Sequence, residues 1–114
     1  MQYLLLLYDD EKRAEGYGDE EMEKWFSVTN EMDSAGKMVS GEALQPTASA
    51  TTVRMNGNKV ITTDGPFAET KEQLGGFYVI EAKDLDEAIS WAQKMPHVPK
   101  GGSVEIRPIM KFDS

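Results

Sequence analysis

The chain has 114 residues, no cysteine and a formal net charge of −8 at neutral pH. A chain of this length forms one domain, residues 1–114, that buries enough surface to fold without a metal, and the missing thiols exclude disulfides, cysteine nucleophiles and cysteine metal sites. Its acidity repels phosphate backbones and its 12 Lys and Arg residues are scattered, so we expect no direct nucleic-acid binding.

The first predicted element is a strand over residues 2–8, which is apolar on both of its alternating faces. Such a strand belongs in the middle of a sheet, where both faces are covered. The apolar run is too short for a signal sequence or a membrane span, and Asp9, Asp10 and Glu11 follow it at once. We therefore expect a cytoplasmic protein that makes no membrane contact.

A polar loop over residues 9–18 leads to the first predicted helix. Asp19 suits the N-cap because glutamates follow it in the first turn, and Gly36 lies where a left-handed residue ends a helix. One apolar stripe recurs at helical spacing between them and is predicted to pack on the sheet. The stripe consists of Met22, Trp25, Phe26, Thr29, Met32 and Ala35.

A second strand is predicted over residues 37–43, and a β-hairpin follows it. Residues 50–55 and 59–63 are rich in β-branched side chains and flank Asn56-Gly57, the pair that best tolerates a type I′ turn. Asn58 fits either the turn or the returning strand, so the register stays open at this point.

Residues 76–81 are again apolar on both faces and predict a second central strand. Asp84 and Glu87 have the spacing of a capping box for a second helix, which Pro96 is predicted to end. A last strand over residues 103–107 precedes a proline, which favours an edge position. The buried stripe predicted for the second helix comprises Leu85, Ala88, Ile89, Ala92 and Met95.

Without the hairpin, the predicted order is strand, helix, strand, strand, helix, strand, which is the split βαβ of a ferredoxin-like α+β sheet. Both helices then lie on one face, and the other face exposes apolar side chains of the two central strands. The inserted hairpin could cover part of that face, but a second copy of the sheet would cover all of it. We expect a homodimer, since isologous dimers are the commonest closed assembly.

The densest concentration of polar chemistry lies between the hairpin and the second central strand, in residues 64–72. Asp64 followed by Gly-Pro predicts a stiff turn, and Thr70 with Gln73 has the spacing of a capped helical turn. Three carboxylates and one ammonium within nine residues suit a polar ligand or a proton transfer if they face a cavity. In the competing interpretation Asp64 and Thr70 only cap turns, Phe67 fills the core and the other charges are solvated.

The segment Asp-Gly-Pro-Phe-Ala-Glu-Thr-Lys-Glu at 64–72, with Leu-Gly-Gly at 74–76, resembles the signature of the DGPF branch of the YCII-related family. Residues 41–46, 84–88 and 104–108 are similar to other segments of that branch, so the resemblance covers nearly the whole chain. It implies a ferredoxin-like dimeric α/β barrel with a cleft beside the signature and no established activity. It also implies a transcription-related context, because some relatives are linked with extracytoplasmic-function sigma factors.

Other YCII-related proteins carry a histidine and aspartate pair, proposed as catalytic, in the first half of the chain. The only histidine here is His97, beyond the second helix, so no position of this chain matches that pair. Between Pro96 and Pro99, His97 is interpreted as an exposed or structurally bonded residue, with a general base as the alternative. Gly75-Gly76 and Gly101-Gly102 lack nucleotide-binding spacing and are expected to mark turns. We expect no metal and no cofactor.

The residues thus support two functions. In the first, a polar cleft binds a small molecule, and a cofactor-free reaction would use Asp64 or Glu69 for proton transfer. Arg107 would complete this polar patch beside Glu42 or Glu69, unless it forms an exposed ion pair. In the second, the chain is a non-catalytic dimeric module that binds a protein in a sigma-factor-linked context. The predicted ligand-binding residues are Glu42, Gln45, Asp64, Gly65, Pro66, Phe67, Glu69, Thr70, Lys71, Glu72 and Arg107.

Overall fold

The computed structural model describes residues 1–112, so the last two residues of the predicted domain lie outside it. Its body is built on a four-stranded antiparallel sheet of β1 (Gln2–Asp9), β2 (Met38–Ala43), β5 (Gln73–Glu81) and β6 (Ser103–Pro108), in the order β2-β5-β1-β6. The order is that of the predicted split βαβ, with β1 and β5 in the middle and β6 at an edge. The predicted turn at Gly75-Gly76 is wrong, because both glycines lie inside β5.

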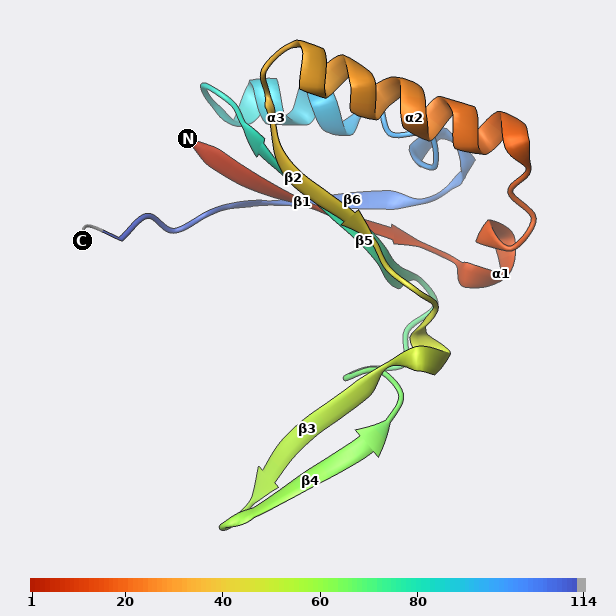
Figure 1. Ribbon diagram of the computed structural model, residues 1–114, viewed down its shortest axis with the longest axis vertical. Coiled ribbons are helices and arrows are strands. Elements are labelled where there is room, and N and C mark those ends of the chain that lie inside the picture. The colour runs from red at the N-terminus through yellow and green to blue at the C-terminus, as the bar shows by residue number, and fades with distance from the viewer. Residues whose placement is uncertain (113–114) are drawn as a thin grey trace.

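Helices α2 (Asp19–Ser34) and α3 (Leu85–Ala92) both cover one face of the sheet (Figure 1). Asp84 caps α3 as predicted, since its carboxylate accepts a hydrogen bond from the Glu87 backbone N–H at 2.9 Å. The N-cap of α2 is Gly18 rather than Asp19, so Asp19 is the first helical residue and acts on the helix dipole instead. Helix α3 also ends before Pro96, in a short turn.

Each helix buries part of the predicted stripe. On α2, Met32 is buried as predicted, but Glu21 and Val28 are buried too, while Met22 and Phe26 are exposed. The buried Glu21 forms an ion pair with Lys100, which lies beyond α3. Of the second predicted stripe, Ala88, Ala92 and Met95 are buried, whereas Leu85 and Ile89 are exposed and Trp91 is buried instead.

The core lies between the helices and the sheet face that they cover. Tyr3 and Leu5 of β1 and Tyr78 and Ile80 of β5 point into it and pack with Met32 of α2. Because side chains alternate along a strand, the neighbouring residues of β1 and β5 lie on the opposite face. Within residues 1–112, no helix has the length and apolar character needed to span a membrane.

The segment predicted as a polar loop contains a one-turn helix, α1 (Glu11–Ala14). Asp10 caps it by accepting a hydrogen bond from the Lys12 backbone N–H at 2.9 Å. The Glu11 carboxylate accepts bonds from the backbone N–H and hydroxyl of Thr47, at 2.7 and 2.6 Å, and its own N–H donates to the Gln73 side chain at 2.9 Å. This short helix therefore ties the start of the chain to the segments before and after the hairpin.

The hairpin forms a separate two-stranded sheet of β3 (Thr51–Asn56) and β4 (Lys59–Asp64), preceded by the short 3-10 helix η1 (Thr47–Ser49). Figure 1 shows it standing away from the body on the side of the sheet opposite α2 and α3. We call it the arm. Its loop is Gly57-Asn58 instead of Asn56-Gly57, because Asn56 pairs with Lys59. Gly57 has φ 60° and Asn58 does not have a positive φ, which is the pattern of a type II′ turn and not of type I′.

Candidate functional site

The signature residues 64–72 connect the arm to the sheet. Asp64 is the last residue of β4 and pairs with Thr51. Gly65 has φ 109°, its N–H donates to the Ala50 carbonyl at 2.7 Å, and its carbonyl accepts from the Thr52 hydroxyl at 2.9 Å. The first turn of the signature is therefore held on both sides by the base of the arm.

The rest of the signature runs along the surface. Phe67 is 77% exposed, so it does not fill the core. The Arg54 guanidinium lies over the Phe67 ring, with 5.0 Å between the guanidinium carbon and the ring centre. The helical turn predicted after Thr70 does not form. The Thr70 hydroxyl donates to the Glu72 carbonyl instead of accepting from an N–H, and the Gln73 amide donates to the Thr70 carbonyl at 2.5 Å.

The signature contributes to two shallow grooves rather than to one. Glu69 and Thr70 lie in a groove of about 340 Å³ that Asp64 does not line, so the two predicted catalytic carboxylates do not share it. Lys71 and Glu72 lie in another, of about 350 Å³, beside Arg13. The other lining residues are Thr47, Ala48, Gly65, Pro66, Ala68 and Gln73 for the first groove and Asp10, Lys100 and Gly101 for the second.

Three further residues of the predicted site come from other places. Glu42 lies on β2 at one edge of the sheet and Arg107 on β6 at the other edge. Three strand spacings, roughly 14 Å in total, separate these edges, so one chain does not bring Arg107 beside Glu42. Gln45 is exposed in the segment before the arm and accepts a hydrogen bond from the Ser49 hydroxyl at 3.3 Å.

A largely apolar cleft of about 340 Å³ lies between α2 and the sheet edge formed by β2 and β5. Two glycines line it on the side of the sheet, at positions where neighbouring atoms leave no room for a side chain. A Cβ atom on Gly41 would come within 2.7 Å of the Tyr78 ring, and one on Gly76 within 2.9 Å of the Glu42 carbonyl oxygen. The lining comprises Leu7, Ala14, Tyr17, Met22, Trp25, Thr29, Met38, Gly41, Glu42, Ala43, Gly75, Gly76, Phe77 and Tyr78.

Hydroxyl groups supply the polar chemistry of this cleft. The Tyr17 hydroxyl donates to the Asp9 carboxylate, which also accepts from the Arg13 guanidinium. Burial, and then the hydrogen bond and the charge of Asp9, raise the pKa of Tyr17 to about 12, so this phenol stays neutral at physiological pH. Farther along the cleft, the Thr29 and Tyr78 hydroxyls lie 2.7 Å apart and share a hydrogen bond.

Behind the cleft, His97 is 2% exposed and packs its ring against Trp25, with 5.2 Å between the ring centres. Its Nε2 lies 2.9 Å from the Ser103 carbonyl oxygen and therefore carries the proton. Burial lowers the pKa of His97 despite this bond and the nearby Asp9 carboxylate, so the ring is neutral. His97 is thus buried and structurally bonded, as one of the interpretations of the sequence holds, and it does not line the cleft.

Residues 1–113 match the YCII-related domain. The chain belongs to the YCII-related family. An uncharacterized protein of Rhizobium meliloti (strain 1021) is 40% identical to this YCII-related chain over 117 residues, which cover 98% of this chain and 94% of that protein. The likeness extends over both the body and the arm, but it names no ligand and no reaction.

Three residues of this YCII-related site, Asp9, Arg13 and Tyr17, were missed by the sequence analysis because their segment was interpreted as a loop. A signal was present, since the three residues recur every four positions, which is helical spacing. The cleft itself left a weaker signal: Gly41 and Gly76 are glycines within strands, which mark a close approach of backbone or an unfilled space. Within residues 1–112, no group of three His, Asp or Glu side chains is arranged to hold a metal.

Proposed function

We propose that this YCII-related protein binds a small, largely apolar molecule in the cleft between α2 and the sheet, with the Tyr17 hydroxyl at its polar end. The cleft of about 340 Å³ is the observation that carries the proposal, because it is walled by Leu7, Trp25 and Met38 and offers only a few hydroxyl groups for orientation. The net charge of −8 favours a neutral or cationic ligand over an anion.

The signature supports this site from two sides. Gly75 and Gly76 immediately after it line the cleft, and Lys71 and Glu72 lie in a groove beside Arg13, which holds Asp9. The signature would therefore position α1 and the sheet edge in addition to any contact of its own. Proton transfer by Asp64 or Glu69 stays a prediction, for which the exposed groove at Glu69 is the place to look.

The ligand proposal is tested by a thermal-shift screen of neutral and cationic metabolites, since a ligand that binds only the folded state raises its unfolding temperature. Hits are retested on Met22→Glu, which puts a charge into the cleft, and on Phe26→Glu, which changes an exposed residue of the same helix outside the lining. We expect Met22→Glu to abolish the shift and Phe26→Glu to keep it. If Glu69→Gln abolished the shift and Met22→Glu kept it, the ligand would lie in the signature groove instead.

We also propose that the chain is a homodimer that packs through the face of the sheet without helices. That face carries Leu4, Leu6, Phe77 and Val79 in its middle, where a monomer would expose a contiguous apolar surface. The arm does not fold back over it (Figure 1).

Light scattering over a range of concentrations should give twice the mass of one chain. A monomer at about 100 µM would refute the dimer and leave the ligand proposal intact.

The arm is also the observation that favours the alternative function, a non-catalytic dimeric module that binds a protein. A projecting hairpin with exposed apolar residues suits a protein contact better than a metabolite site. A sigma-factor-linked partner stays a prediction. The two functions differ in the thermal-shift screen, because the module has no reason to respond to metabolites through Met22.

A further inference from the structure

The arm receives little stabilisation from its own chain. Every residue of β4 is exposed, and in β3 only Thr52 is half-buried. An isolated two-stranded hairpin is marginally stable in water, because it has no layer to cover either of its faces. The arm therefore needs a surface that a single chain, over residues 1–112, does not supply.

The two faces of the arm differ in how far the rest of the chain covers them. On one face, the Arg54 guanidinium lies over the Phe67 ring and Arg54 pairs across the hairpin with Ile61, so the chain covers this face in part. The other face carries a stripe of exposed apolar side chains that no described residue covers. We call it the arm stripe: Val53, Met55 and Val60, which are 64%, 61% and 64% exposed.

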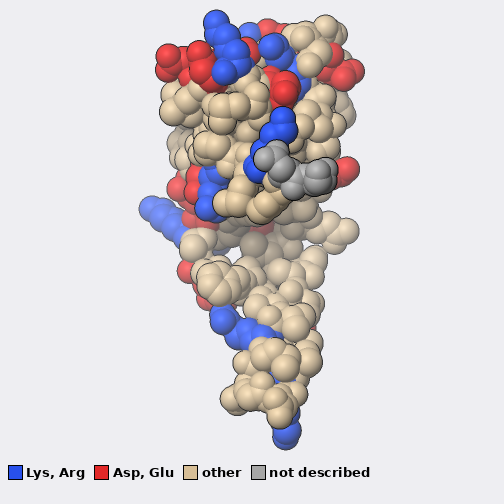
Figure 2. Space-filling view, turned by 90° about the vertical axis from the view of Figure 1, so that its left-hand side faces the viewer, with Lys and Arg blue, Asp and Glu red and all other residues tan. Residues whose placement is uncertain are grey.

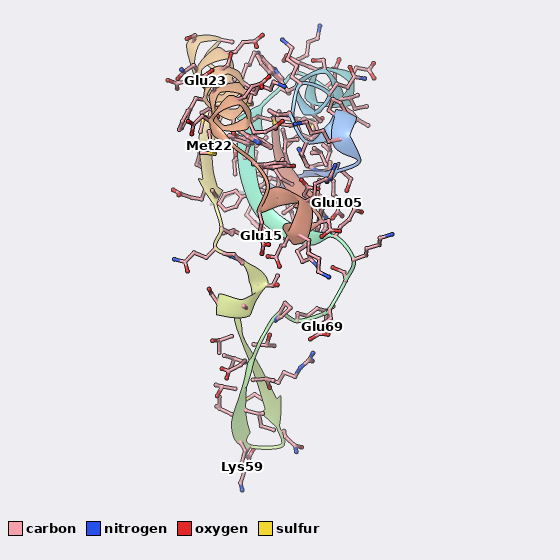
Figure 3. The ribbon with its side chains drawn as sticks, turned by 90° about the vertical axis from the view of Figure 1, so that its right-hand side faces the viewer. Glu15, Met22, Glu23, Lys59, Glu69 and Glu105 are labelled. Carbon is pink, nitrogen blue, oxygen red and sulfur yellow. The ribbon has the colours of Figure 1, made fainter. Side chains whose placement is uncertain are left out.

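The arm also differs in charge from the rest of the chain. The arm, residues 51–64, contains Arg54 and Lys59 and a single acidic residue, Asp64, at its base. Its net charge is therefore +1, and with a net −8 for the chain the remaining residues carry −9. Figure 2 shows basic groups along the arm and acidic groups interspersed with basic ones on the body, and Figure 3 places Lys59 at the arm's tip. The arm is thus electrostatically complementary to the body of another copy of the same chain.

The direction and length of the arm make that contact possible. It projects from the side of the sheet without helices, which is the side of the proposed dimer interface (Figure 1). A six-residue strand spans roughly 20 Å, and face-packed sheets lie about 10 Å apart. A second copy on this face would therefore lie alongside the arm for its whole length, from the partner's sheet to its helices.

We propose that the arm of each copy clasps the second copy, with the arm stripe packed on the partner's body and the net positive charge of the arm attracted to the acidic surface of that body. The clasp rests on the homodimer proposed above and adds a second, reciprocal contact to it. It assigns the arm, an insert in the split βαβ fold, to assembly. It also explains why the arm is apolar on a face that its own chain leaves in solvent.

The clasp is tested by the dimer dissociation constant, measured by sedimentation. Val60→Glu puts a charge on the arm stripe, and Ile61→Glu is the matched control on the other face of the arm. We expect Val60→Glu to raise the dissociation constant at least about tenfold and Ile61→Glu to change it much less. A wild-type monomer would refute the dimer itself. A wild-type dimer that Val60→Glu leaves unchanged would refute the clasp and leave the dimer standing.

A second measurement does not depend on affinity. The chain has no cysteine, so Val60→Cys provides a single attachment point for a photoreactive maleimide. Irradiation of the labelled protein should give a covalent dimer, and peptide mapping should locate the crosslink on the body of the second copy. A crosslink within one chain would refute the clasp. A crosslink in cell extract to a different protein, with no covalent homodimer, would assign the arm to the protein-binding module instead.

Discussion

The Tyr17 hydroxyl donates a hydrogen bond to the Asp9 carboxylate, which joins the segment between α1 and α2 to the end of the central strand β1. Arg13 binds the same carboxylate from within α1, so a single acidic group organises the polar end of the cleft. The bond also keeps the Tyr17 proton in place, because removing it would set two negative charges side by side. The consequences can be measured both on the phenol and on the stability of the fold.

Replacing Tyr17 by Phe should lower the free energy of unfolding by about 1 kcal/mol at pH 7, since a hydrogen bond to a charged group is lost from a partly exposed position. The pKa of Tyr17 in the folded protein, about 12, is above the unfolded value of 10. Its stabilising contribution is therefore complete below pH 10 and disappears as the pH rises through 12.

Denaturant unfolding of the wild type and Tyr17→Phe from pH 7 to 12 checks this prediction, because the difference between them isolates Tyr17 from the other titrating groups. We expect the two curves to converge above pH 10. Absorbance at 295 nm gives an independent reading, as the component missing from Tyr17→Phe should titrate near pH 12. A component near pH 10 would show that the Asp9 bond does not hold the proton in solution.

The pKa of His97 should lie below its ordinary value of 6.5, because burial disfavours the charged ring more than Ser103 and Asp9 favour it. With a lowered pKa in the folded state, its contribution to stability is complete above about pH 6.5 and is lost as the pH falls through the folded value. His97 is the single histidine, so proton NMR follows one imidazole signal without assignment. A titration midpoint at or above 6.5 would contradict the buried, neutral ring.

Gly102→Ala should destabilise the protein by about 1–3 kcal/mol through overpacking. The added Cβ would lie 2.4 Å from the His97 ring and 3.0 Å from the His97 carbonyl oxygen, and His97 is too deeply buried to move aside. Gly75→Ala is the control, since its Cβ would meet no atom closer than 4.0 Å. Denaturant midpoints compare the two, and equal midpoints would mean that the loop before β6 yields easily.

The strand order could be predicted from the sequence because the apolar pattern of β1 and β5 places both strands in the middle of the sheet. The faces of the helices could be predicted only in part, because α2 buries Glu21 and exposes Met22. The ion-pair partner of Glu21 is Lys100, which is distant in sequence, so local periodicity does not reveal it. Periodicity assigns faces from average polarity and does not anticipate a buried carboxylate.

The candidate site could likewise be predicted only in part. A turn at Gly65 is predicted and is present, but it is held by hydrogen bonds to Ala50 and Thr52 instead of by the predicted Asp64 side-chain bond, and Gly65 has a positive φ instead of an extended conformation. The cleft is a space between α2 and the sheet, and such a space depends on the position of the helix and on the close packing around Gly41 and Gly76. A sequence shows which residues are polar. It does not show which empty volume the packing leaves, so the site was predicted at the charged signature and not at the apolar cleft.

Charged residues line both edges of the sheet on the face without helices, and this suggests a last test of the dimer. Arg107 on β6 pairs with Leu4, and Glu42 on β2 pairs with Phe77, so both project from that face at its two rims. A two-fold axis parallel to the strands would lay β6 of one copy over β2 of the other. Glu105 on β6 pairs with Leu6, the strand partner of Phe77, so it would lie level with Glu42 of the partner subunit. Arg107, two residues along β6, would be the cation between these two carboxylates, twice in each dimer.

Arg107→Glu should therefore weaken the dimer several-fold, because two attractions of up to about 1 kcal/mol each become repulsions. Glu42→Arg alone should have a smaller effect, because Glu105 would attract the new arginine, and the double variant should recover most of the loss of Arg107→Glu, which no merely structural defect would allow. Lys24→Glu on α2 makes the same change in net charge away from this face and controls for general repulsion. If the double variant were weaker than either single one, the strands of the two copies would cross in another orientation. The contact predicted for Arg107 and Glu42 would then be absent between chains as well as within one.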